Sequence, residues 1–443
     1  MARVYKPYPE YKDSEVEWLG GIPLHWNCVR LKYSADLGGN KIEARSVQRY
    51  VGMENIEPGN GRYLAKEDIT PEGLSTSFLK GDILFGKLRP YLAKSWLAEF
   101  SGICSSEFLV LRSKTVSPRF LHYYTLTDEF INQVDASTYG SKMPRASWDF
   151  IGLMPVPIPD TGSEKISNFL DHETAKIDTM IERQQQLIQL LKEKRQAVIS
   201  HAVTKGLNSK SKMCDSGVEW LGEVPENWKV CRIKQVAKLE SGHTPDKKIE
   251  AYWVDCDIPW VSLNDTSQLK EVDYISDTAI YLNEKGIANS SARKLPERCV
   301  VFTRDASIGL AAITTRVMTV SQHIIAWICN EEKVIPEYLL LVFYAMKDEL
   351  ERYTFGATLK TIGMPDINKL AAAFPDIEEQ KTIVDHVFQT RKKLDLLIAK
   401  AESAINVIKE RRAALISAAV TGKIDVRNWV APHTGQTNKE VAA

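Results

Sequence analysis

The chain of 443 residues lacks the usual marks of a secreted, membrane-bound or metal-binding protein. Its seven cysteines stand singly, with no CxxC pair and no histidine at the spacing of metal ligands. An odd number of isolated thiols is typical of a reduced, cytoplasmic protein. No apolar run approaches the roughly 20 residues of a membrane span, and the first residues contain no apolar signal core. We therefore expect a cytoplasmic protein without a metal site.

An excess of charge of one sign is also missing. The 57 lysine and arginine residues balance the 57 aspartate and glutamate residues, so the net charge is zero. A strongly basic balance is usual for proteins that coat nucleic acid without selectivity. The composition argues against that class, but it is compatible with a selective reader whose positive charge is confined to one face.

Catalytic signatures are absent as well. The sequence contains no [DN]PP[YFW] motif of an amino-methyltransferase, no GxxxxGK[ST] phosphate loop, and no HExxH or HxxxH metal motif. Glu379 and Lys381 in PDIEEQK superficially resemble a nuclease pattern. The acidic groups there are too close together for that pattern, and the segment is expected to open a helix. We predict a chain that is not an enzyme and has no cofactor of its own.

Two stretches of the sequence each occur twice. DSEVEWLGGIPLHWNCVRLK from Asp13 returns as DSGVEWLGEVPENWKVCRIK from Asp215, and LLKEKRQAVISHAVTKG from Leu190 returns as VIKERRAALISAAVTGK from Val407. The residues between them diverge, and apolar runs bounded by turn or charged residues, such as GDILFG and RCVVFT, predict short strands. The chain is therefore a duplicated unit with mixed α/β interiors. Divergent sequences between repeated end segments favour two domains that bind different ligands, with drift after duplication as the alternative.

Long helices are predicted at the end of each copy. Apolar residues follow a heptad pattern in both, and the two patterns are in the same register: Ile166, Leu170, Ile177, Ile181, Ile188, Leu191, Val198 and Ala202, then Ile383, Val387, Leu394, Ile398, Ile405, Ile408, Leu415 and Ala419. Gly206 and Gly422 are plausible stops. Each helix of about 40 residues would be roughly 60 Å long. Antiparallel pairing of the two helices within the chain would bury the apolar residues of both heptad patterns. Two unrelated core helices or a homodimeric coiled coil are the alternatives.

The predicted fold class is mixed α/β, with two domains joined by two long helices that form an antiparallel coiled coil with pseudo-two-fold symmetry. The expected boundaries are a first domain at 1–158, a first helix at 159–207, a second domain at 208–374, a second helix at 375–425 and a C-terminal tail at 426–443.

The motifs resemble those of specificity subunits of Type I restriction–modification systems. The resemblance rests on the paired WLGxxPxxW segments, on FGKLRPYLAK and FTRDASIGL, on PDIEEQK, and on the twin helix ends KE[KR]RxA[VL]ISxAVT. It extends from about Asp13 to Lys423, and several motifs occur twice in family order. One departure is PDTGSEK in the first copy, where the family usually has PxxEQ, so this helix is expected to begin differently.

The resemblance implies that each domain is a target recognition domain that reads one half of an asymmetric, bipartite site in double-stranded DNA. It implies that the helices set the gap and dock two modification subunits, which use S-adenosylmethionine to methylate adenine N6. Restriction subunits that hydrolyse ATP with magnesium are further expected partners. The alternatives are a specificity subunit of another modification system and a structural adaptor that does not read DNA.

Residues with hydrogen-bond donors, hydroxyls or positive charge in the aligned turns are candidates for DNA contact. They are Lys87, Arg89, Ser105, Ser106, Lys142 and Arg145 in the first domain, and Arg304, Ser321, Gln322, His323, Lys360 and Thr361 in the second. Gln322 is a candidate reader of adenine. The basic helix ends are candidates for partner docking, with a solvated face as the alternative: Lys192, Lys194, Arg195, Lys409, Arg411 and Arg412. The repeated tryptophans are expected to anchor each domain against the helices, with base stacking as the alternative.

Overall fold

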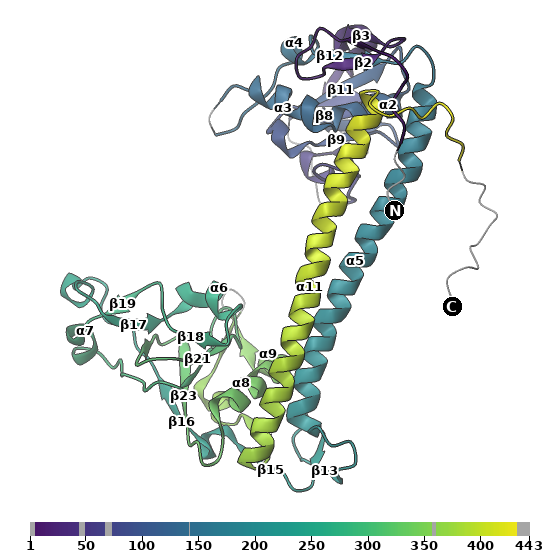
Figure 1. Ribbon diagram of the computed structural model, residues 1–443. Coiled ribbons are helices and arrows are strands. Elements are labelled where there is room, and N and C mark those ends of the chain that lie inside the picture. Colours follow the sequence, from purple (N-terminus) through teal and green to yellow (C-terminus); the bar gives the residue numbers. More distant parts are fainter. Residues whose placement is uncertain (1–4, 44–48, 67–72, 141, 357–359, 432–443) are drawn as a thin grey trace. The chain divides into compact units, whose positions relative to one another are not determined.

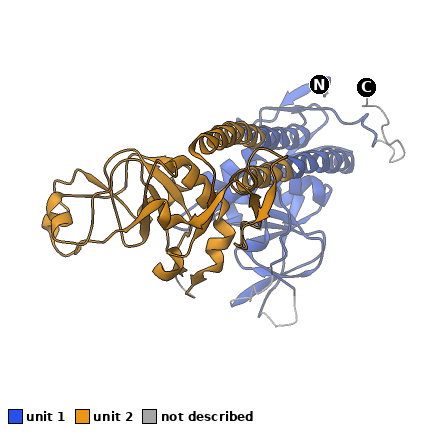
Figure 2. Ribbon diagram, turned by 90° about the horizontal axis from the view of Figure 1, so that it is seen from below, with its two compact units in different colours: residues 1–185, 403–443 blue, residues 186–402 orange. Residues whose placement is uncertain are grey.

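The computed structural model describes residues 5–43, 49–66, 73–140, 142–356 and 360–431, and the structural statements below concern these residues. The chain forms two compact units (Figure 2): unit 1 comprises 1–185 with 403–443, and unit 2 comprises 186–402. Each unit contains one strand-rich domain and one half of each long helix. None of the helices in the described ranges combines the length and apolar character that crossing a membrane requires.

The domain of unit 1 is built on two four-stranded sheets. One has the order β5 (Lys41–Glu43), β7 (Leu74–Phe78), β10 (Gly102–Ser105) and β6 (Tyr50–Val51). The other has the order β4 (Ala35–Gly38), β11 (Phe108–Ser113), β8 (Ile83–Gly86) and β9 (Ser95–Leu97). The smaller elements are β1 (Tyr11–Asp13) paired with β2 (Gly21–Pro23), β3 (Asn27–Arg30) paired with β12 (Pro155–Ile158), α1 (Leu31–Ser34), α2 (Pro118–Thr125), α3 (Asp128–Ala136) and α4 (Trp148–Ile151). The strand predicted from GDILFG is β8, and all four of its residues are buried.

The domain of unit 2 is built on a five-stranded and a three-stranded sheet. Their orders are β16 (Ala237–Ser241), β23 (Ile324–Cys329), β20 (Val300–Thr303), β21 (Ala311–Thr314) and β18 (Tyr274–Ile275), then β19 (Tyr281–Leu282), β17 (Ile258–Val261) and β22 (Thr319–Val320). Pairs of strands are formed by β13 (Met213–Asp215) with β14 (Glu223–Pro225), β15 (Lys229–Arg232) with β26 (Ala371–Phe374), and β24 (Thr354–Phe355) with β25 (Thr361–Ile362). The short helices are α6 (Thr266–Leu269), α7 (Glu284–Ala288), α8 (Pro336–Ala345), α9 (Lys347–Arg352) and α10 (Met364–Ile367). Phe302 of β20, the strand predicted from RCVVFT, stacks on Phe343 of α8 with ring centroids 5.0 Å apart.

The two long helices are α5 (Ser163–Lys205) and α11 (Ile377–Val420) (Figure 1). Both end before the predicted glycines, and Gly206 and Gly422 have φ angles of +71° and +74°. These left-handed angles suit glycine, which has no Cβ to clash.

The helices pair in opposite directions within each unit. In unit 1, Ile166 and Leu170 of α5 share a core with Ile416 and Val420 of α11, while Asp178 pairs with Arg412. In unit 2, Ile199 and Val203 share a core with Ile383 and Val387, while Arg195 pairs with Asp395. Residue numbers therefore rise along one helix as they fall along the other. The predicted antiparallel pairing within one chain is confirmed.

The unusual start of the first helix has a visible effect. Ile377, the first residue of α11, corresponds to Asp160, which lies 217 residues earlier, yet α5 begins only at Ser163. In α11, the buried Gln380 accepts a hydrogen bond from Ile335 N–H at 3.0 Å and donates to two carbonyls. The corresponding Ser163 likewise accepts a hydrogen bond from a backbone N–H of the domain, that of Ser117, at 3.1 Å. The departure changes how the helix begins and leaves its attachment to the domain in place.

Candidate nucleic-acid interface

Three chain segments meet at the end of β8 in unit 1. Lys87 N–H donates to the carbonyl of Glu107 at 2.9 Å, and Arg89 N–H donates to the carbonyl of Pro144 at 2.8 Å. Ala146 N–H donates back to the carbonyl of Lys87 at 2.9 Å. These bonds join the turn after β8, the turn between β10 and β11, and the segment that precedes α4.

The same three backbone bonds recur at the end of β20 in unit 2. Arg304 N–H donates to the carbonyl of His323 at 3.0 Å, Ala306 N–H to that of Lys360 at 2.9 Å, and Ile362 N–H to that of Arg304 at 3.0 Å. We call this three-segment arrangement the turn frame. Its backbone is retained in both copies, whereas its side chains differ at almost every position.

Both turn frames contain a strained residue at the same place. Arg89 and its counterpart Ala306 have φ angles of +50° and +60°, although neither is glycine. A left-handed backbone at a residue with a side chain costs of order 1–3 kcal/mol and is concentrated at functional sites. Its presence in both copies supports a functional role for the frame.

The turn frames bring the predicted DNA-binding residues together. In unit 1 they place Lys87, Arg89, Ser105, Ser106 and Arg145 on the three joined segments, with Lys142 exposed two residues before Pro144. In unit 2 they gather Arg304, Gln322, His323, Lys360 and Thr361 in the same way. Ser321 is 1% exposed, so the expectation of a surface hydroxyl is wrong at that position.

In unit 1 the turn frame holds a guanidinium in a fixed orientation. Arg145 Nη2 and Nε lie 3.0 Å and 3.1 Å from the two carboxylate oxygens of Glu107. The hydrogen bonds and the charge of Glu107 raise the pKa of Arg145 above its usual value. Nε and Nη2 are used by the carboxylate of Glu107. The donors of Nη1 are therefore left to face a phosphate or a base edge.

In unit 2 the turn frame holds a chain of polar side chains instead. Asp305 is 3% exposed, and its Oδ2 lies 2.5 Å from Nδ1 of His323. Nε2 of His323 lies 3.3 Å from Nε2 of Gln322, and the hydroxyl of Thr244 donates to Oε1 of Gln322. The two copies therefore present chemically different surfaces from one backbone design.

Sequence reasoning missed several residues of the frames. Glu107 and Thr244 were not predicted, because their roles depend on partners 38 and 78 residues away. Tyr139 and Phe355 were also missed, although they are 63% and 60% exposed at equivalent positions beside the frames. The alignment of TYG with TFG was the signal that could have identified these two aromatic residues.

Comparisons with known proteins find similar sequences and structures. The family model for the Type I restriction modification DNA specificity domain matches residues 225–406. The specificity subunit of the Type I restriction enzyme MjaVIII of Methanocaldococcus jannaschii is 22% identical over 94% of this chain and 98% of its own length. The chain is therefore similar to specificity subunits of Type I restriction enzymes, over nearly its whole length in one relative and through residues 225–406 in the family model.

Other relatives match over a shorter span. The MjaIX specificity subunit of Methanocaldococcus jannaschii is 28% identical over 188 residues, which are 41% of this chain and 43% of that protein. The EcoDI specificity subunit of Escherichia coli is 26% identical over 34% of this chain and 36% of its own length. In both cases the match spans less than half of the relative.

Two solved structures share the fold. One, from work on complex assembly and conformational transition of the type I R-M system, has a TM-score of 0.66 at 18% identity and covers 91% of this chain and 99% of its own. The HsdS subunit from Thermoanaerobacter tengcongensis has a TM-score of 0.51 at 16% identity and covers 91% and 98%. At these identities, the likeness concerns the fold alone.

The predicted basic residues at the helix ends divide into two groups. Lys192, Lys194, Lys409 and Arg411 are exposed. Arg412 is 9% exposed and its Nε lies 3.0 Å from Asp178 Oδ1, so the expectation that it docks a partner is wrong. Arg195 is half-exposed and pairs with Asp395 at 2.6 Å. Both arginines join the two helices, because each lies opposite an aspartate of the other helix.

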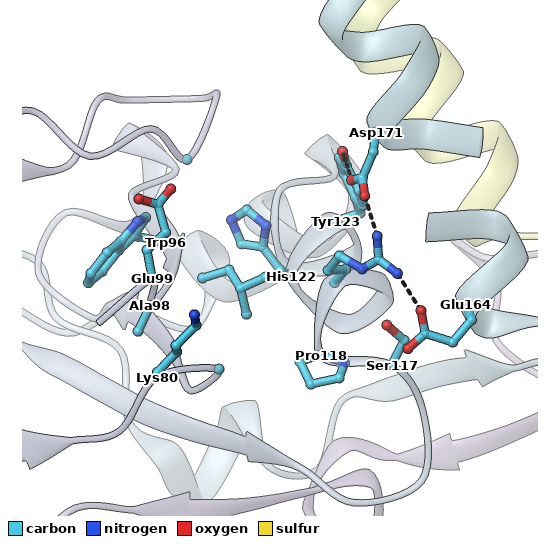
Figure 3. Close-up of a pocket in the computed structure, with 14 residues that line it drawn as sticks. Lys80, Trp96, Ala98, Glu99, Ser117, Pro118, His122, Tyr123, Glu164 and Asp171 are labelled. Carbon is cyan, nitrogen blue, oxygen red and sulfur yellow. Dashed lines mark hydrogen bonds and ion pairs between the residues drawn. The ribbon is translucent and has the colours of Figure 1, made fainter. Parts of the chain in front are cut away.

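A cavity of about 470 Å³ in unit 1 is lined by side chains that attach the first domain to α5 (Figure 3). Arg119 of α2 pairs there with both Glu164 and Asp171 of α5, and Tyr123 donates to Asp171 at 2.8 Å. The cation is neutralised by two carboxylates, which makes this cavity a poor site for DNA. No group of three or more histidine, cysteine or acidic residues suited to a metal occurs in the described ranges.

His122 in this cavity predicts a sensitivity to acid. Desolvation lowers the pKa of its imidazole from 6.5 to about 4, and its Nε2 lies 3.0 Å from the carbonyl of Ser95. Between these values the unfolded chain binds a proton that the folded chain does not, so stability falls as pH falls from 6.5 to 4. We expect a decrease of up to about 1.4 kcal/mol per pH unit in unit 1.

His122→Gln keeps a donor for the Ser95 carbonyl and does not titrate, so it should flatten this dependence. Hydrogen exchange of unit 1 amides between pH 4 and 7 measures it, with the exposed His25→Gln as control. The same acid sensitivity in wild type and His122→Gln would show that other groups cause it.

Proposed function

We propose that this chain is the DNA sequence-recognition subunit of a Type I restriction–modification complex, in which each domain reads one half of a bipartite site. The observation that carries the proposal is the turn frame, which repeats one backbone design with different side chains. A retained backbone fixes how a domain approaches the duplex, and different side chains give each half-site its own bases. The arrangement suits an asymmetric site.

The helices are proposed to set the gap between the half-sites and to dock two modification subunits. Each unit exposes an equivalent apolar pair on its helices: Met180 with Val407 in unit 1, and Leu397 with Leu190 in unit 2. The exposed lysines and arginine of the helix ends lie close to these pairs in the sequence. Two equivalent surfaces support the docking of two copies of one partner.

Catalysis is proposed to belong to the partners. S-adenosylmethionine would bind to the modification subunits, and ATP with magnesium to the restriction subunits. This chain would contribute DNA recognition and the geometry of the assembly.

An electrophoretic mobility shift of the complex with its modification subunits tests the proposal. The complex should retain a duplex carrying its site far more tightly than a duplex of the same composition in shuffled order. Equal affinity for both duplexes would favour the alternative, a structural adaptor that does not read DNA.

A phosphate-binding role is predicted for Lys87, which is half-buried beside the exposed Arg89. Lys87→Ala should weaken binding to all duplexes and shallow the dependence of log K on log salt by about 0.9 for each phosphate that the variant no longer neutralises. Titration with fluorescent duplex at several salt concentrations measures the slope. The exposed Lys165→Ala is the control, since this residue lies on α5 and donates to the carbonyl of Arg427, and an unchanged slope for Lys87→Ala would remove Lys87 from the interface.

A further inference from the structure

The hydrogen-bonded side chains in the turn frame of unit 2 place a proton on one nitrogen of a histidine ring. Oδ2 of the buried Asp305 lies 2.5 Å from Nδ1 of His323. An ionised carboxylate only accepts hydrogen bonds, so Nδ1 carries the proton. In the neutral ring Nε2 then has a lone pair and accepts.

The same chain orients the amide of Gln322. Nε2 of His323, as an acceptor, receives an N–H from Nε2 of Gln322, 3.3 Å away. The hydroxyl of Thr244 donates to Oε1 of the same amide. With the neutral ring, these two contacts orient both ends of the amide. One N–H and one lone pair of Oε1 remain on this exposed side chain.

This remaining pattern is complementary to one base. Adenine presents a donor at N6 beside an acceptor at N7 in the major groove, which match Oε1 and the N–H of an amide. Guanine presents two acceptors there, so its O6 would face Oε1 without a proton between them.

Buried polar atoms beneath Gln322 are a second observation. Oγ of Ser321 and Oδ1 of Asp305 make no hydrogen bond within the described part of the chain, although both residues are at least 97% buried. Such atoms are rare in folded proteins, and an ordered water or ion can supply the partner that the side chains do not.

We infer that the second domain reads one adenine of its half-site through Gln322, and that Asp305, His323 and Thr244 are positioning residues that set the donor–acceptor order of its amide. This inference rests on the proposed function. The first domain has Ser106 and Glu107 at the places of Gln322 and His323, and Glu107 holds Arg145 instead. The hydrogen-bonded set of Asp305, His323, Gln322 and Thr244 therefore has no equivalent in the described part of the first domain, and we expect it to act on one half-site only.

Selection from a randomised DNA pool tests the inference. The complex of the full chain with its modification subunits is incubated with duplexes randomised over both half-sites and the gap, and the bound duplexes are sequenced. Wild type should enrich a bipartite motif with an adenine at a defined position. Gln322→Ala should reduce the preference for that adenine by about ten- to a hundredfold and leave the other positions unchanged.

Variants of the positioning residues separate orientation from direct contact. Thr244→Val removes the hydroxyl donor at nearly constant volume, and His323→Phe removes the ring acceptor. Each should lower the preference at the same adenine by about tenfold, with unchanged affinity for duplexes that lack it. Ser106→Ala, at the equivalent place in the first domain, is the matched control and should leave this adenine unaffected.

The outcomes distinguish the inference from the function beneath it. If wild type enriches a bipartite motif but Gln322→Ala changes no position, or changes a position that is not adenine, the inference is overturned and the proposed function stands. If wild type enriches no motif, the proposed function fails.

Discussion

Arg412→Ala is expected to destabilise unit 1 by about 3 kcal/mol, because it leaves a carboxylate in a protected place without its main partner. Arg412 Nε lies 3.0 Å from Oδ1 of Asp178, and the two side chains are 10% and 16% exposed. Arg62 contacts the other oxygen of Asp178 at 3.0 Å, but its side chain is 45% exposed and can compensate only in part.

The duplication supplies a matched control for this prediction. Arg195 and Asp395 lie 217 residues from Arg412 and Asp178 in the repeat, and form the corresponding pair at 2.6 Å. Their side chains are 38% and 45% exposed, so Arg195→Ala should cost about 1 kcal/mol or less.

Hydrogen exchange by mass spectrometry should measure both changes, since a chain of two units need not unfold in one transition. The amides of the helix segments around Asp178 and Arg412 report on unit 1, and those around Arg195 and Asp395 on unit 2. Equal destabilisation by the two variants would show that burial does not set the strength of these pairs.

Trp26→Ala should destabilise unit 1 by about 4 kcal/mol, since it empties a large volume in a packed core. Trp26 is 0% exposed and shares this core with Ile416 and Val420 of α11. Its ring contacts Tyr8 and Phe120, with centroid distances of 5.9 Å and 6.3 Å.

Trp18 in the same motif is the control for this change, because it is only partly buried against that core. Trp18→Ala should cost less than half as much as Trp26→Ala. The loss of stability of each variant is measured by urea unfolding, with hydrogen exchange of the unit 1 amides as the readout. Normal stability of Trp26→Ala together with a reduced affinity for DNA would contradict the anchoring role and indicate base stacking.

Much of the fold could be predicted from the sequence because its signals are periodic or repeated. The heptad pattern and the two terminal glycines predicted both long helices, and identical register predicted that they pair. Short apolar runs predicted β8 and β20. These signals are local, so neighbouring residues suffice to read them.

The pairing partners could not be predicted in the same way. Arg195 and Arg412 were read as surface charges, since the sequence does not reveal that an aspartate of the other helix lies opposite each of them. Ser321 was expected to contact DNA because it lies in an aligned turn beside Gln322 and His323, although the turn between β22 and β23 leaves it only 1% exposed. Side-chain orientation in a turn depends on tertiary contacts.

The candidate site was predictable in its position but not in its chemistry. The aligned turns after β8 and β20 were the correct places to search, because duplicated turns occupy equivalent positions. The polar chain from Asp305 to Thr244 depends on contacts between segments far apart in the sequence, so no local pattern predicts it.

The central claim is that one chain reads two separate halves of a DNA site. Mapping N6-methyladenine in the DNA of cells that carry this chain with its complete set of partner genes tests it most directly. The account predicts methylation at a single bipartite motif with a constant gap. Methylation confined to an uninterrupted motif, or a motif that is unchanged when this chain is deleted, would contradict it.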